Sequence, residues 1–392
     1  MLKIDYEHCT GCGACVQRCP KQCITWTSGE FDFRYPTIDE SVCIDCHLCE
    51  KVCPIVKELH IPEQQKVYAL VNKNQDTLMH STSGGAFSAI AEQILSNGGV
   101  VYGCSMEEGF QVKHIRITGI EDLNKLRGSK YVQSDTGNTF KLVEADLKAG
   151  LKVLYSGTPC QISGLLHFLG KEYENLLTVD IVCHGVGSQA YFDKFLEDLR
   201  RRKGNVQEIR FRDKKYVGWS CGGGVVVSLS PTGEKAEMPF YNHENYYYSY
   251  FLSGDIYRKS CYSCKYANVS RQGDITLGDF WGVEALKLPL DTYDGSSLII
   301  VNTDKGKAAV SVLTKVEKIE TNTEDAIRHN YQLSSPSILT QKREKRLKEY
   351  QNCCGIEIQN KYLKENKVIL IKGKIKTMLP YSVKLRIRKL KR

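Results

Sequence analysis

The sequence has no apolar run that approaches the roughly 20 residues of a membrane-spanning helix. Its first residues, Met1 to Tyr6, also lack the basic-then-apolar order of a secretory signal. The 17 cysteines are not spread along the chain like the framework of a disulfide-stabilised secreted protein, but cluster at the spacings of metal ligands. We therefore expect a cytoplasmic protein in a reducing compartment.

Acidic residues are nearly missing from one segment. Residues 361–392 hold twelve lysines or arginines and one acid, Glu365, so they carry +11 in a chain whose net charge is +9. The other 360 residues therefore sum to −2. Such a tail is often only solvated, and the alternative is a peripheral contact of residues 361–392 with an anionic membrane surface or another anionic partner. Sequence-specific binding of nucleic acid is not expected.

A cysteine repeat organises the first fifty-four residues. Each cysteine of a first run recurs 34 residues later, and each run closes with Cys-Pro; the runs are Cys9, Cys12, Cys15, Cys19 and Cys43, Cys46, Cys49, Cys53. This is the spacing of bacterial ferredoxins, in which the fourth cysteine of a run binds the other cluster. We expect one [4Fe-4S] cluster on Cys9, Cys12, Cys15 and Cys53, and a second on Cys43, Cys46, Cys49 and Cys19. The alternative is a pair of zinc sites, which normally use two CxxC pairs.

No G-x-G-x-x-G fingerprint and no P-loop occur in the chain. A different glycine-rich element follows the apolar strand expected at 67–71, with Ser81, Ser83, Gly84 and Gly85 directly before a helical pattern that starts at Ala86. A helix N-terminus with free amides and hydroxyls suits a phosphate or the edge of a flavin. An ordinary capped helix is the alternative. Lys130 and Tyr131, in a Gly/Ser-flanked loop, either contact a cofactor or belong to a solvated loop.

Four further cysteines are expected to converge. Cys160 and Cys183 each follow an expected strand, and a helix joins the two strands. If the strands are parallel neighbours, both cysteines lie at the edge where α/β folds bind ligands. Cys261 and Cys264 form a CxxC in a later loop. Together they suit a third [4Fe-4S] cluster or a structural zinc, and the alternative is two core cysteines beside an unrelated CxxC.

These patterns predict an α/β and α+β protein. Residues 1–62 are expected to form a bacterial-ferredoxin-like domain with two [4Fe-4S] clusters and a small hairpin near residues 24–35. Residues 63–335 are expected to form a mixed α/β flavin and iron–sulfur domain. Residues 336–392 are expected to hold a charged, solvated helix and the basic tail.

The chain resembles the beta subunits of coenzyme F420-reducing hydrogenases and dehydrogenases, a family that also contains flavin-dependent, iron–sulfur vinyl reductases of chlorophyll synthesis. The resemblance covers about residues 1–300 and rests on six blocks in order: Ser81–Gly85, Gly128–Tyr131, Gly157–Gln161, Val182–Gly185, Ser260–Cys264 and Gly273–Gly282. It implies FAD at the Ser-Gly-Gly helix and a cluster held by the later cysteines. The basic tail departs from the family pattern, and no hydrogenase-type nickel ligands are present.

The expected function joins these parts. Iron–sulfur clusters pass single electrons, hydride acceptors take two, and a flavin mediates between them. We expect an oxidoreductase that exchanges electrons with a redox protein such as ferredoxin and reduces or oxidises a small hydride acceptor, such as a deazaflavin or an activated double bond. The alternative is a non-catalytic electron-transfer subunit that docks on a partner oxidoreductase.

Overall fold

The computed structural model of the protein describes residues 5–56 and 66–378. The expected domain boundary at residue 62 and most of the basic tail beyond residue 378 lie outside these residues. None of the helices in the described ranges is both long and apolar enough to cross a membrane.

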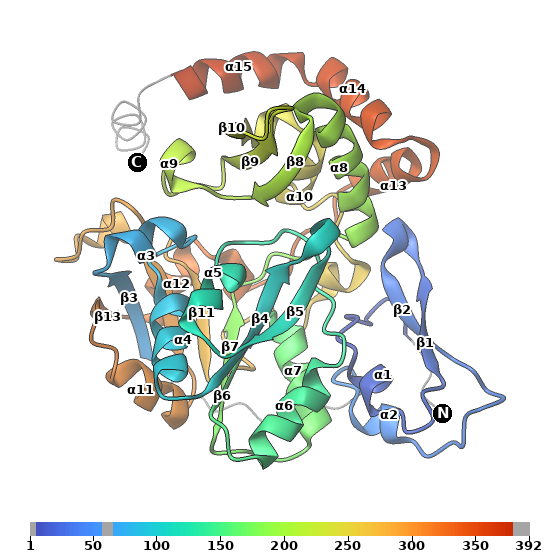
Figure 1. Ribbon diagram of the computed structural model, residues 1–392, viewed down its shortest axis with the longest axis vertical. Helices are drawn as coiled ribbons and strands as arrows, with labels where there is room; N and C mark the ends of the chain where they lie inside the picture. Colours follow the sequence, from blue (N-terminus) through green and yellow to red (C-terminus); the bar gives the residue numbers. More distant parts are fainter. Residues whose placement is uncertain (1–4, 57–65, 379–392) are drawn as a thin grey trace.

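The strands form a large mixed sheet, a small antiparallel sheet and a hairpin (Figure 1). The eight-stranded sheet has the order β13-β3-β12-β11-β7-β6-β4-β5, in which β4, β6, β7 and β11 run parallel. The strands are β1 (Ile24–Ser28), β2 (Arg34–Ile38), β3 (Lys66–Asn72), β4 (Val100–Met106), β5 (Val112–Ile117), β6 (Val153–Gly157), β7 (Leu176–Ile181), β8 (Asn205–Arg210), β9 (Gly223–Leu229), β10 (Lys235–Tyr241), β11 (Ile275–Asp279), β12 (Ser297–Val301) and β13 (Val316–Thr321).

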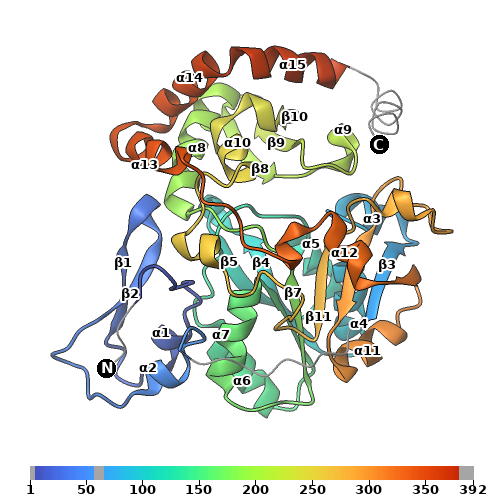
Figure 2. The same ribbon diagram turned by 180° about the vertical axis from the view of Figure 1, so that it is seen from behind.

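Helices connect and cover these sheets (Figures 1 and 2). The α-helices are α1 (Ala14–Arg18), α2 (Leu48–Lys51), α3 (Gln75–His80), α4 (Ala86–Ser96), α5 (Leu123–Leu126), α6 (Thr139–Lys148), α7 (Pro159–Leu169), α8 (Gln189–Lys203), α9 (Lys214–Val217), α10 (Tyr246–Leu252), α11 (Asp304–Ser311), α12 (Thr323–Arg328), α13 (Lys342–Asn352), α14 (Gly355–Glu365) and α15 (Lys367–Met378). Short 3₁₀ turns are η1 (Glu30–Asp32), η2 (Glu108–Phe110), η3 (Ile120–Asp122), η4 (Asn242–Glu244), η5 (Lys259–Ser263), η6 (Val283–Leu286) and η7 (Tyr331–Leu333).

The large sheet is buried on both faces because its central strands are apolar at consecutive positions. In β6, Leu154 faces a core formed with α4 and α5, whereas Val153 and Tyr155 face a second core formed with α6 and α7. The carboxyl ends of β6, β7 and β11 therefore meet at one edge of a three-layered unit, as the sequence predicted for β6 and β7.

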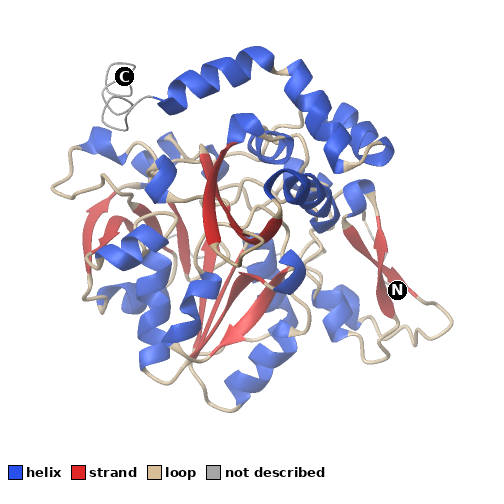
Figure 3. Cartoon of the chain, turned by 45° about the horizontal axis from the view of Figure 1, so that its top comes forward, coloured by secondary structure: helices blue, strands red, loops and turns tan. Residues whose placement is uncertain are grey.

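Another core joins distant parts of the chain. Its residues come from the hairpin β1–β2, from α8, from the small sheet β10-β9-β8 and from the tyrosine-rich helix α10, with α13 and α14 at its edge. Figure 3 shows these helices gathered above the small sheet. The tyrosines at 246–248 are fully buried, as expected for core packing.

The structure confirms the expected mixed α/β fold with a ferredoxin-like N-terminal region, and it differs in two local features. The hairpin turn is longer than expected, because η1 occupies Glu30–Asp32 and moves the second strand to Arg34–Ile38. Helix α13 is not simply solvated. Arg346 is buried, with its guanidinium 3.8 Å from the centre of the Tyr250 ring, because a charged helix can bury cations that find aromatic partners.

Candidate functional site

The first predicted cysteine set comes together around α1 and α2. Burial raises the pKa of the Cys12 thiol to about 12, and the nearby thiols of Cys9 and Cys53 raise it further. Burial likewise raises the pKa of Cys15, with contributions from Cys12, Cys9 and Cys53. Thiols crowded in this way repel one another as thiolates, and bound iron offsets that repulsion with positive charge. The donor set therefore fits a cluster, and it includes Cys53 from the second run.

The second predicted set lies at the outer end of the same region. Cys19, Cys43, Cys46 and Cys49 line one pocket together with Cys23 and apolar residues that include Ile24 and Ile38. Cys23 lies behind this set, with its sulfur 3.4 Å from that of Cys19. Cys46 is exposed, so this set faces the surface.

The third set assembles at the carboxyl edge of the large sheet. Cys160 lies in the first turn of α7, where Thr158 and Gln161 form a capping box, and Cys183 lies just past β7. Burial raises the pKa of Cys183 well above its usual value, and the nearby thiols of Cys261, Cys160 and Cys264 act in the same direction. The four predicted cysteines are thus neighbours.

No group of three or more His, Cys, Asp or Glu side chains within residues 5–56 and 66–378 is arranged to hold a single metal ion. The three sets share neighbourhoods, and their role as cluster ligands stays a prediction.

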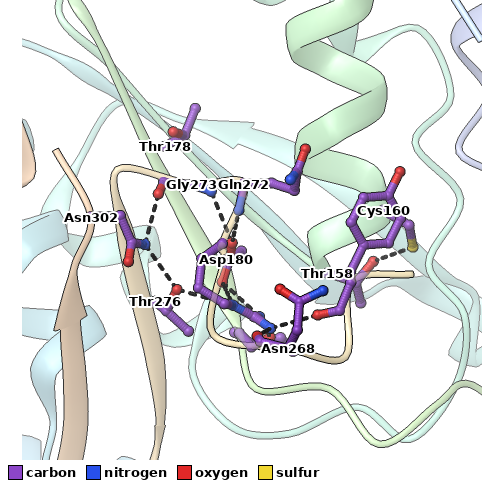
Figure 4. A network of polar contacts seen from close by, with 12 residues as sticks. Thr158, Cys160, Thr178, Asp180, Asn268, Gln272, Gly273, Thr276 and Asn302 are labelled. Atoms are coloured by element: carbon purple, nitrogen blue, oxygen red, sulfur yellow. Dashed lines mark hydrogen bonds and ion pairs between the residues drawn. The ribbon is translucent and has the colours of Figure 1, made fainter. Parts of the chain in front are cut away.

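The loop after the CxxC is fixed by a buried ion pair that sequence reasoning missed. Asp180 in β7 is fully buried, and its carboxylate accepts from Arg271 at 2.9 Å and from the backbone amide of Gly273 at 2.8 Å. Arg271 also donates to the carbonyl oxygens of Ile181 and Tyr266. Figure 4 shows Asp180 at the centre of this network, beside Thr158 and Cys160. The available signal was an acid inside the apolar run Leu176–Val182.

The first and third cysteine sets lie against each other across α7. A Cβ atom on Gly164 would lie 2.9 Å from both the Cβ and the sulfur of Cys12, so only glycine admits this approach. Gly164 is one turn of α7 after Cys160, and the charge of Cys160 acts on Cys12. This contact places the two sets next to each other, with the second set farther out.

Arg258 fastens the same junction. Its side chain is buried, and it donates to the carbonyl oxygens of Cys9 at 2.7 Å and Arg34 at 3.1 Å and to the side chain of Gln133 at 3.2 Å. Its guanidinium also lies 4.1 Å from the centre of the Tyr35 ring. The ferredoxin-like region is therefore tied to the body through one buried cation, which also places positive charge beside Cys9.

The predicted flavin loop is a tight connection between α3 and α4. Gly85 has φ +84°, and the N-cap of α4 offers no side-chain hydrogen bond, so the helix lacks the polar cap of the alternative interpretation. The Ser81 hydroxyl donates to the carbonyl of Thr77, and the Ser83 hydroxyl donates to the carbonyl of Ser296, both at 2.6 Å. In this structure both hydroxyls are therefore engaged with backbone.

Lys130 and Tyr131 lie beside this loop, because the hydroxyl of Ser129 donates to that of Thr82. The ammonium of Lys130 donates to the carbonyl oxygens of Arg127 and Lys125. The ring of Tyr131 stacks on Phe251 with centroids 4.5 Å apart. The structure thus brings both residues to the predicted site but engages them in local packing.

Sequence reasoning also missed a buried cluster on the other side of the loop. Arg212 pairs with Asp279 at 2.5 Å, and the indole N–H of Trp219 donates to the same carboxylate at 2.6 Å. Trp219 stacks on Trp281, which lies in the Gly273–Gly282 block. Asp279 therefore fixes the segment 212–219 against the end of β11, while the other acid of that block, Asp274, bonds the backbone amide of Thr178.

Lys214 holds the Ser-Gly-Gly loop from within. Its buried ammonium donates to the carbonyl oxygens of Leu78 and Ser83, each at 2.6 Å, and burial lowers its pKa from 10.5 to about 7. Between these pH values the folded chain binds fewer protons than the unfolded chain, so this residue makes the free energy of unfolding rise with pH.

We expect Lys214→Met to remove that dependence. The difference in unfolding free energy between wild type and variant should change by up to about 1.4 kcal/mol per pH unit between pH ~7 and ~10.5. Urea unfolding at a series of pH values measures it. Lys215→Met is the matched control, because the Lys215 side chain is 66% exposed. Parallel stability profiles for Lys214→Met and wild type would contradict the assignment.

Comparisons with known proteins agree with this arrangement. Residues 150–327 match the family model of the C terminus of the coenzyme F420 hydrogenase/dehydrogenase beta subunit, and residues 8–56 match the 4Fe-4S dicluster domain. The first region contains Cys160, Cys183, Cys261 and Cys264, and the second contains the whole cysteine repeat.

Three curated relatives share parts of the chain. It is 26% identical over 218 residues to one of the subunits of the F420H2 dehydrogenase of Methanosarcina mazei, covering 53% of this chain and 61% of the relative. It is 30% identical over 168 residues to the coenzyme F420-dependent sulfite reductase of Methanocaldococcus jannaschii, covering 41% and 25%. It is 41% identical over 81 residues to ferredoxin 7Fe of Hydrogenibacillus schlegelii, covering 19% and 95%. The chain thus spans less than two thirds of the length of the first two.

A chain of the F420-reducing [NiFe] hydrogenase complex of Methanosarcina barkeri is a structural neighbour, with a TM-score of 0.43 and 18% identity over 78% of this chain and 93% of that one. The family matches confirm the resemblance that the sequence motifs indicated. This chain belongs to the family of coenzyme F420 hydrogenase/dehydrogenase beta subunits and carries a 4Fe-4S dicluster domain at residues 8–56.

Proposed function

We propose that the chain is an iron–sulfur flavoprotein oxidoreductase that exchanges electrons with a redox protein and reduces or oxidises a small hydride acceptor. A deazaflavin of the F420 type or an activated double bond is the proposed substrate class. The observation that carries the proposal is the contact of Cys12 with Gly164, which brings two buried four-cysteine sets against each other.

The proposed ligand sets follow the neighbourhoods described above. Two [4Fe-4S] clusters would be held by the ferredoxin repeat, and a third by Cys160, Cys183, Cys261 and Cys264. When bound, the clusters supply one-electron transfer, and FAD couples it to hydride chemistry. The residues of the chain fix the spacing of these sets, exclude water from the two inner ones and place the Arg258 cation between the domains.

The surface near Cys46 is the proposed entry for a redox partner. Cys46 is exposed, and the nearby apolar side chains of Ile44 and Val42 are 58% and 45% exposed. Apolar side chains around an exposed redox site suit a transient protein contact. The same feature supports the alternative, a non-catalytic electron-transfer subunit that docks on a partner oxidoreductase.

The proposed FAD site is the crevice wall formed by the Ser81–Gly85 loop, the loop at Lys130 and Tyr131, and the segment that Arg212 and Asp279 fix. Support comes from the uncapped start of α4 and from the positive φ of Gly85, which keeps side-chain bulk away from that turn. In the structure Ser81, Ser83 and Lys130 bond to backbone carbonyls, so binding through these groups would require them to exchange partners.

Anaerobic purification with iron and flavin analysis tests the proposal. We expect about 12 irons and about one flavin per chain. Cys261→Ser should lower the iron content to about eight, because it leaves the two ferredoxin sets intact. The matched control Cys354→Ser, in a cysteine outside all three sets, should retain all of it.

Two results would change the conclusion. About eight irons in the wild type would remove the third cluster. Full iron content with no flavin, and no turnover of a hydride acceptor without a partner protein, would favour the electron-transfer subunit.

A further inference from the structure

Helix α15 leaves an unusual amount of apolar surface in water. Val368, Ile369, Ile371 and Ile375 are 64%, 52%, 60% and 59% exposed. Elsewhere in the described part of the chain, large exposed apolar side chains occur singly or in pairs, such as Ile338 and Leu339. Scattered exposed side chains are normal, but four within eight residues form a patch that indicates a binding surface.

The patch has a defined face. Val368, Ile371 and Ile375 follow one another at i, i+3 and i+7, so they form one stripe along the helix. The side of the helix that carries Gly373 rests on η4, where an added Cβ would lie 2.1 Å from the ring of His243. Because Gly373 holds one side of α15 to the protein, the stripe on the other side points outward. Figures 1 and 3 show α15 on the rim of the molecule, beyond the small sheet.

Positive charge flanks the stripe. Lys367 and Lys372 are exposed and lie on its two sides, and no acidic residue follows Glu365 in the sequence. The whole segment 361–392 carries +11. Lysine stems can lie along an apolar surface while their ammonium groups reach past it.

We propose that α15 docks the protein on an anionic membrane surface, lying in the plane of the lipid headgroups. The stripe would enter the boundary with the acyl chains, and Lys367 and Lys372 would reach the lipid phosphates. With 12 residues the helix is about 18 Å long, which suits lying on a bilayer and not crossing it. A lipid surface uses both the apolar stripe and the charge, whereas RNA would use only the charge.

Flotation with lipid vesicles tests this proposal on the full chain. We expect the wild type to float with vesicles of phosphatidylcholine and phosphatidylglycerol, but not with phosphatidylcholine alone, and to be released by high salt. The triple variant Val368→Ser/Ile371→Ser/Ile375→Ser should bind more weakly by at least about tenfold for each side chain removed. Lys367→Gln/Lys372→Gln should lose about fivefold for each lysine.

The control Ile338→Ser/Leu339→Ser removes exposed apolar side chains outside α15 and should float like the wild type. All variants are compared at equal iron content, which shows that they are folded. The proposal is overturned if the wild type stays in solution with anionic vesicles or floats equally with neutral ones. It is also overturned if the stripe variant floats like the wild type, if the lysines serve only binding to a homopolymeric RNA, or if the stripe variant only dissociates a dimer.

Discussion

Asp180→Asn is expected to lower the free energy of unfolding by about 3–5 kcal/mol and to empty the third cysteine set. The substitution leaves the Arg271 guanidinium buried without its counter-charge, and a broken buried pair costs far more than a surface one. It also weakens the acceptor for the backbone amides of Gln272 and Gly273. Because these contacts hold the loop that follows Cys264 against β7, the site should fail before the ferredoxin-like region does.

Asp146→Asn is the matched control for this variant. Asp146 also accepts from an arginine, Arg116, at 2.7 Å, but that pair is partly exposed, so its loss should cost about 1 kcal/mol or less. The measurement is thermal unfolding together with iron content. We expect Asp180→Asn to retain about eight irons and Asp146→Asn about 12. Equal stability and equal iron content in the two variants would show that the Asp180 pair does not support the site.

The cysteine arrangement was predictable because it depends on short-range spacing and on strand order. The repeat at Cys9 and Cys43 fixes which thiols are close in space, since three residues of separation bring thiols to one side of a turn. The convergence of Cys160 and Cys183 followed from two parallel strands that end at one edge. The structure brings Cys53 to the first set and Cys19 to the second, as the crossed pattern predicted.

The residues that join the domains were not predictable in this way. Arg258 contacts Cys9 from nearly 250 positions away, and nothing in its local sequence marks it as buried. Asp180 and Arg271 pair across 91 positions, so neither the burial nor the partner can be read from one strand. Burying a charge depends on a partner that only the tertiary fold supplies, whereas thiol spacing is encoded locally. The same reason explains why α13 was expected to be solvated although Arg346 is buried on Tyr250.

Gly84→Ala should cost about 3 kcal/mol of stability and displace the Ser-Gly-Gly loop. An added Cβ would lie 2.1 Å from the carbonyl oxygen of Leu70 and 2.4 Å from the backbone nitrogen of Ser297. These two residues are register partners in β3 and β12, so neither can shift without opening the sheet. The loop must therefore move outward, which breaks the hydrogen bond from Ser83 to the carbonyl of Ser296.

Gly98→Ala provides the control that isolates this clash. Both substitutions restrict the unfolded chain equally, but Gly98 has no atom within 4 Å of an added Cβ and only the strain of φ +74°, which costs about 1 kcal/mol. Thermal unfolding and the flavin retained after anaerobic gel filtration distinguish the two variants. We expect Gly84→Ala to lose both stability and flavin, and Gly98→Ala to keep its flavin. A Gly84→Ala protein that is destabilised but still retains flavin would move the proposed cofactor site away from this loop, while the two inner cysteine sets would stay as described.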